Sequence, residues 1–184
     1  MGADIHMYIE YASKTPSPHA TPRDKRWWSG FGGRINPGRN YSLFGLIADV
    51  RDARHGALFD LRGFPNDAGW AVNEDAYLSI NDELADEEGW CSLAQAEQWS
   101  RHGSEIEYYD NGKPWRVTHP DWHSHTWLTS DELAQIYARY AELFKDDPYG
   151  GGKVGIEWLA ILAAMRALES DGANDVRVIC WFDN

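Results

Sequence analysis

The strongest constraint on the fold is a helical repeat in the last third of the chain. From Thr129 to about Lys145 the apolar residues recur at intervals of three and four, a spacing that lines one face of a helix. Thr129 and Glu132 form a Thr-x-x-Glu capping box at its start. After the break "DDPYGGGK", a second apolar repeat predicts a helix from about Val154 to Ser170. Both helices need a surface on which to bury their apolar faces.

Strand patterns near the two ends of the chain can supply that surface. "DIHMYIEY", residues 4–11, alternates apolar and polar residues, so it predicts a half-buried strand with Ile5, Met7 and Ile9 on the inner face. "DVRVICWF", residues 175–182, is typical of a buried strand. These patterns predict an α+β fold in which a mixed or antiparallel sheet includes both terminal strands and is packed by the two longer helices.

The remaining patterns are shorter. Asn40 is a suitable N-cap for a short buried helix over residues 41–50, and Ser92 with Gln95 predicts a capping box on another helix. Residues 13–40 are rich in proline and glycine and predict a long irregular loop. The length of 184 residues suits one globular domain, so a single domain over residues 1–184 is expected.

Composition limits the partners. The net charge of −12 disfavours duplex nucleic acid, because binding along a phosphate backbone needs a continuous basic surface. No apolar run approaches the ~20 residues that a membrane-spanning helix requires. The two cysteines are too few for a disulfide framework, and no charged-then-apolar leader opens the sequence. A cytoplasmic protein without a membrane partner is therefore expected.

The histidine-rich stretch "DWHSHTWLTSDEL", residues 121–133, is the clearest candidate site. His123 and His125 would share a face if the segment is extended, as Asp4 and His6 do on the first strand. Imidazole and carboxylate ligands suit zinc, manganese, iron or nickel, so these four residues are candidate ligands for a divalent metal. The structural alternative is a pair of histidines that brace the loop against the helix that follows.

Two arginines could hold an anion near this site. Arg34 ends the glycine-rich "GFGGR", although such segments are often only flexible loops. Arg39 lies just before the predicted cap of the helix over residues 41–50, and a helix N-terminus favours anions. The rings of Trp122 and Trp127 could stack on a nucleobase, with core or loop packing as the alternative.

Five segments taken together, "GADIHMYIE", "RNYSLFGLIADVR", "RGFPND", "HSHTWLT" and "WFDN", resemble a family of uncharacterised proteins encoded by bacteriophages and prophages. The resemblance covers nearly the whole chain and implies a cytoplasmic phage accessory protein. The family opens with Met-Gly-Cys-Asp-Ile-His, whereas this chain has Ala3. The resemblance also implies one site assembled from distant residues, namely Asp4, His6, Arg39, Arg62, His123, His125 and Asp183.

The sequence favours a metal-dependent hydrolase that acts on a phosphoester or nucleotide-like substrate. Asp4, His6, His123 and His125 would bind the cation, Glu10 would act as a base, and Arg34, Arg39 and Arg62 would contact the anionic substrate. The alternative is a non-catalytic counter-defence or regulatory protein that sequesters a nucleotide signal or binds a host protein. Its motivation is the acidic balance together with ten Trp residues.

Overall fold

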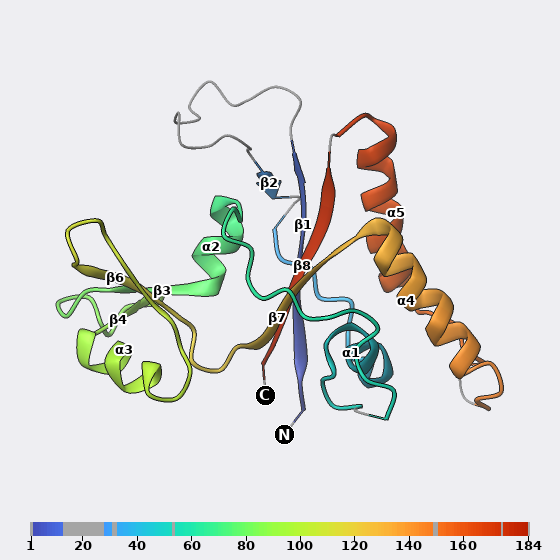
Figure 1. Ribbon diagram of the computed structural model, residues 1–184, viewed down its shortest axis with the longest axis horizontal. Helices are drawn as coiled ribbons and strands as arrows, with labels where there is room; N and C mark the ends of the chain where they lie inside the picture. The colour runs from blue at the N-terminus through green and yellow to red at the C-terminus, as the bar shows by residue number, and fades with distance from the viewer. Residues whose placement is uncertain are drawn as a thin grey trace. The chain divides into compact units, whose positions relative to one another are not determined.

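The computed structural model (Figure 1) describes residues 2–12, 28–30, 33–52, 54–148, 151–173 and 175–183. Residues 13–27 of the predicted irregular loop lie outside the described residues. The elements in chain order are β1 (Asp4–Ala12), β2 (Trp28–Gly30), α1 (Tyr41–Ala48), α2 (Trp70–Ala76), β3 (Tyr77–Ile80), β4 (Trp90–Cys91), α3 (Leu93–Ser100), β5 (Ile106–Tyr108), β6 (Pro114–Thr118), β7 (His123–Thr129), α4 (Ser130–Leu143), α5 (Ile156–Ser170) and β8 (Val176–Asp183). The predicted α+β class is confirmed.

The strands form two sheets of four. The first sheet has the order β2-β1-β8-β7, and its two central strands are the first and last of the described chain. β1 and β8 pair antiparallel from Asp4 opposite Asp183 to Tyr11 opposite Val176. The predicted pairing of the two terminal strands is therefore confirmed.

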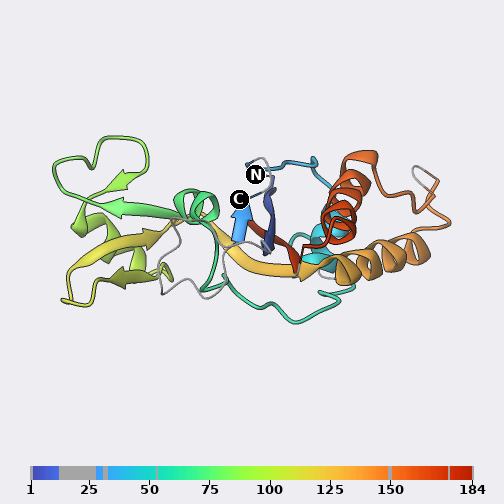
Figure 2. The ribbon, with the colours of Figure 1, turned by 90° about the horizontal axis from the view of Figure 1, so that it is seen from above.

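Three helices cover one side of the first sheet, which we call the helix face. Figure 2 shows α1, α4 and α5, coloured cyan, orange and red, on one side of the strands. Apolar side chains of these helices pack with Ile5, Met7 and Ile9 of β1 and with Cys180 and Phe182 of β8 to form the main core. None of the helices in the described part of the chain is long and apolar enough to cross a membrane.

Local capping rules place the helix starts. The side chain of Asn40 accepts a hydrogen bond from Leu43 N, so Asn40 is the N-cap of α1 as predicted. Ser92 with Gln95 starts α3, and Thr129 with Glu132 starts α4, each through a complete capping box. The two longer helices agree with the predicted ranges within a few residues.

β1 is not half-buried, and this part of the prediction is wrong. Tyr8 and Glu10, placed on the outer face by the alternation, are only 5% and 0% exposed. β1 is an interior strand, and residues 61–69, which we call the covering loop, contact the outward side chains of the sheet. We call this second side of the sheet the loop face.

The contacts divide the chain into two compact units. The first comprises Met1–Gly69 and His123–Asn184, and the second comprises Trp70–Trp122. The second unit contains the sheet of order β4-β3-β6-β5, with a small core around Cys91, Ala96 and Val117. The sequence shows no sign of this division, and the expected single domain over residues 1–184 stays a prediction.

Candidate functional site

The candidate site lies on the loop face of the first sheet. Directly paired residues of neighbouring strands share a face, so the pairing of Asp4 with Asp183 and of His6 with Trp181 places all four side chains there. Glu10 and Arg177 are paired further along the same two strands. Residues from the beginning and end of the chain thus form one polar surface.

His6 is held at both ring nitrogens. Its Nε2 lies 2.9 Å from Oδ2 of Asp183, and Nη1 of Arg34 lies 3.0 Å from its Nδ1. A guanidinium can only donate, so Nδ1 accepts and Nε2–H donates to the carboxylate. The other oxygen of Asp183 accepts a hydrogen bond from Asp4 N at 3.0 Å. The carboxylate therefore fixes the orientation and tautomer of the imidazole.

A second ion pair lies beside this dyad. Arg39 donates from Nε and Nη2 to the two carboxylate oxygens of Asp4 at 2.7 and 2.8 Å. These hydrogen bonds lower the pKa of Asp4, so the carboxylate stays ionised. The predicted residues Asp4, His6, Arg34 and Arg39 are thus linked with Asp183 through a chain of hydrogen bonds and ion pairs.

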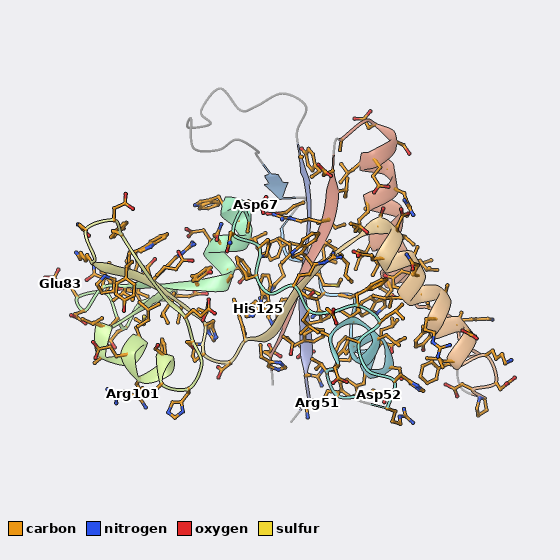
Figure 3. The ribbon with its side chains drawn as sticks, in the orientation of Figure 1. Arg51, Asp52, Asp67, Glu83, Arg101 and His125 are labelled. Carbon is orange, nitrogen blue, oxygen red and sulfur yellow. The ribbon has the colours of Figure 1, made fainter. Side chains whose placement is uncertain are left out.

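The indole of Trp181 forms the floor of the site. It stacks on His6 with an interplanar angle of 4° and on His125 with an angle of 29°. Phe64 of the covering loop contacts both Trp181 and His125. His125, labelled on β7 in Figure 3, therefore belongs to the loop face. Burial, together with the nearby His123, lowers the pKa of His125 to about 4, so its imidazole is neutral near pH 7.

His123 does not share that face. It is paired with Phe182 and stacks on its ring, whereas Thr126 is paired with Cys180, and the register shifts between His123 and Thr126. Phe182 and Cys180 both belong to the core under the helices. The shift coincides with Ser124, whose φ of 55° lies in the left-handed region. His123 is therefore on the helix face.

The four predicted metal ligands do not form one cation site as they lie. Both oxygens of Asp4 are bonded to Arg39, both nitrogens of His6 have partners, and His123 and His125 lie on opposite faces. Within the described ranges, no group of three or more His, Cys, Asp or Glu side chains is placed to hold a metal ion. The predicted zinc, manganese, iron or nickel ion has no assembled ligand set there.

Glu10, predicted as a base, is fully buried. It accepts hydrogen bonds from Nε and Nη2 of Arg177 at 3.0 and 2.8 Å and from Gly69 N at 2.6 Å. Burial raises the pKa of Glu10, although the hydrogen bonds from Arg177 act in the opposite direction. Arg177 also donates from Nη1 to Asp67, labelled in Figure 3, at 2.7 Å. Glu10 and Arg177 therefore fix the covering loop to the sheet.

Arg62 and Trp127 lie at the other end of the covering loop. The guanidinium of Arg62 lies 4.2 Å from the ring centroid of Trp127 and is paired with Glu132. They line a cavity of about 460 Å³ together with Phe64, Pro65, Asn66, Asp67, Thr129, Asp175, Val176 and Arg177. Because carboxylates pair with both arginines, this cavity is suited to an uncharged planar group more than to a phosphate.

Trp122 belongs to the second unit, where its ring stacks on His119 at a centroid distance of 4.5 Å. Trp127 belongs to the first unit. The two predicted stacking residues thus belong to different units.

Trp181 and Arg177 are not among the residues predicted from the sequence. An arginine inside the apolar run "DVRVICWF" was the available signal, because a charge in a buried strand needs a partner. Ala3, which differs from the family motif, is fully buried in the core of the helix face. A thiol at this position would thus point away from Asp4 and His6.

Comparison with models of protein families, with curated proteins and with solved structures finds no match to this chain.

Proposed function

We propose that this chain is a phage accessory protein that hydrolyses a phosphoester or nucleotide-like substrate at His6, in the cytoplasm of a bacterial host. The observation that carries the proposal is the imidazole of His6 between the carboxylate of Asp183 and the guanidinium of Arg34. The resemblance to phage and prophage proteins supports the biological setting.

The chemistry follows from the tautomer. With Nε2–H directed at Asp183, the basic nitrogen of His6 is Nδ1, which faces Arg34. A phosphoryl oxygen that replaces Nδ1 as the partner of Arg34 would place the phosphorus atom beside the imidazole. His6 can then take a proton from the attacking water as the new P–O bond forms. The leaving oxygen departs on the opposite side of the phosphorus atom and takes its proton from solvent water as the old P–O bond breaks. The imidazolium of His6 then releases its proton to solvent.

The neighbouring groups fit these roles. Asp183 stabilises the imidazolium that forms during proton transfer, as a carboxylate does when it orients a catalytic histidine. Arg39 is paired with Asp4, which shares the strand face of His6, and it adds positive charge to the site, although Asp4 neutralises part of it. A metal ion is not needed for these steps, and the divalent metal stays a prediction that elemental analysis of the protein tests.

The test is a comparison of His6→Gln with His102→Gln on a panel of p-nitrophenyl phosphate, bis-p-nitrophenyl phosphate and nucleoside phosphates. We expect His6→Gln and Asp183→Asn to lower kcat by ~100-fold or more, because the first removes the general base and the second removes the carboxylate that stabilises its imidazolium. His102 is exposed in the second unit and serves as the matched control. Equal rates for the two histidine variants would refute the proposal.

A second candidate function is non-catalytic sequestration of a nucleotide signal. The observation in its favour is the cavity of about 460 Å³, which is lined by Trp127 and Phe64 among others and suits the uncharged base of a nucleotide more than its phosphate. Calorimetry against a nucleoside and nucleotide panel, with recovery of unchanged ligand, distinguishes it from an enzyme. Asn66→Ala should weaken such binding, whereas Asn111→Ala in the second unit should not.

A further inference from the structure

The second unit concentrates the negative charge of the chain. Residues 70–122 contain twelve Asp or Glu residues and three Lys or Arg residues, which accounts for −9 of the net charge of −12. Two tyrosines at the end of β5, Tyr108 and Tyr109, are nevertheless 59% and 52% exposed. Adjacent exposed rings on a highly charged unit are typical of a contact surface, because aromatic residues are enriched in interfaces.

The same region already contains a bound guanidinium. The guanidinium carbon of Arg116 lies 3.9 Å from the ring centroid of Tyr77 and 4.2 Å from that of Trp115. Its Nε donates to Oε2 of Glu107 at 2.7 Å. This unit therefore holds an arginine between two aromatic faces and a carboxylate, an arrangement that favours guanidinium over other groups.

One exposed tyrosine continues this series of rings. Tyr109 stacks on Trp115 with a centroid distance of 5.3 Å and an interplanar angle of 24°. We call Tyr77, Arg116, Trp115 and Tyr109 the aromatic ladder. Because Tyr109 remains half-exposed, its ring offers solvent-accessible π surface at one end of the ladder.

The surroundings of the ladder are electronegative. Burial and the charge of Glu107 raise the pKa of Tyr77 to about 12, and Glu105 adds to this effect. Asp110 directly follows Tyr109 in the sequence. A cation that approaches the exposed tyrosines therefore meets both aromatic faces and carboxylates.

We propose that the second unit docks an arginine-rich segment of a protein partner, whose guanidinium groups extend the aromatic ladder on Tyr109 and Tyr108. Charge complementarity with the net charge of −9 selects a basic partner. Stacking selects arginine over lysine, because the planar guanidinium is more weakly hydrated and lies flat on rings. This binding role is independent of the hydrolysis proposed for His6.

The experiment measures fluorescence anisotropy of labelled nona-arginine and nona-lysine peptides against the full chain. We expect the arginine peptide to bind about fivefold more tightly than the lysine peptide, since each exposed cation–π contact contributes ~2- to 5-fold. The double variant Tyr108→Ala, Tyr109→Ala keeps every charge and should remove that preference. Tyr41→Ala replaces an exposed tyrosine of the first unit and should leave the preference unchanged.

A second pair of variants tests the charge. Glu87→Gln with Glu88→Gln should weaken binding of the arginine peptide more than Asp146→Asn with Glu157→Gln, which removes the same charge from the first unit. If the loss of the Tyr109 stack unfolds the double variant, Tyr108→Ala alone should still reduce the preference by about half or more. Equal affinity for both peptides, or a preference that survives without the tyrosines, would overturn the proposal.

Discussion

His123 and His125 lie on opposite faces of β7, although only one residue separates them. In a regular strand two such residues share a face, and the left-handed conformation at Ser124 breaks this alternation. Nε2 of each ring is buried and has no hydrogen-bond partner among the residues that the structure describes. The histidine pair therefore packs against Phe182 on one side and Trp181 on the other.

The first prediction concerns metal content. We expect elemental analysis of the protein purified without a histidine tag to give the same metal content for the parent and for the His123→Ala, His125→Ala double variant. The reason is that one cation cannot be reached from both faces of a strand at the ~2.0–2.2 Å that imidazole ligands require. A loss of about one equivalent of zinc, manganese, iron or nickel in the double variant would instead restore the predicted metal site.

The second prediction concerns pH. The folded protein holds His125 with a pKa of about 4, below the ordinary value of 6.5. The unfolded chain therefore binds a proton near pH 6.5 that the folded chain binds only near pH 4. The neutral imidazole of His125 therefore contributes fully to the free energy of unfolding above about pH 6.5. This contribution is lost as the pH falls toward 4.

Urea denaturation at about pH 7 and about pH 5 measures this contribution, which should be on the order of 2 kcal/mol. His125→Gln should reduce the pH dependence by that amount, because a neutral amide does not titrate. His102→Gln, at an exposed position, should keep the dependence of the parent. The idea fails if the two variants respond to pH alike.

The third prediction concerns the ion pair of Glu10 and Arg177. Arg177→Met should lower the free energy of unfolding by about 3–5 kcal/mol, because it leaves the buried carboxylate of Glu10 without its cation. It should also speed hydrogen exchange in residues 61–69, which lose the bond from Arg177 to Asp67. Arg139→Met breaks an exposed pair with Glu142 and should cost less than about 1 kcal/mol. A similar small loss for Arg177→Met would contradict the role assigned to the pair.

The fourth prediction concerns Gly45 in α1. A Cβ at this position would lie 2.2 Å from the carbonyl oxygen of Asp52, which is backbone and cannot rotate away. Gly45→Ala should therefore destabilise the protein by about 1–3 kcal/mol or more, despite the better helix propensity of alanine. Thermal unfolding of Gly155→Ala provides the comparison, because the nearest atom there belongs to the flexible side chain of Glu157. Comparable melting temperatures for the two variants would show that α1 can shift.

Local rules account for the parts of the fold that the sequence predicts well. Asn40 and Thr129 cap helices through atoms three residues away, and the strand pattern of β1 is read from alternate residues. The burial of Glu10 depends instead on Gly69, 59 positions further along the chain. No pattern within a single element contains that contact, so the outer face of β1 was predicted to be exposed.

The candidate site could be predicted only in part, because some of its contacts join segments that are distant in the sequence. Asp4 and His6 on one strand face follow from alternation, but their partners Asp183 and Arg34 come from distant segments. The position of His123 depends on one residue with positive φ at Ser124, where serine gives no warning. The residue types thus indicated the chemistry of the site, whereas the strand register determines which of these residues lie on the same face of the sheet.

The pairing of β1 with β8 also determines when the first sheet can form during translation. The two central strands of the first sheet are separated by most of the chain, so this sheet cannot be completed until β8 has been made. Residues 70–122 are continuous and can reach their own contacts earlier. During translation β1 must therefore wait with one edge unpaired, and a nascent chain stalled before Val176 would expose the strand that bears His6 to aggregation or to a chaperone.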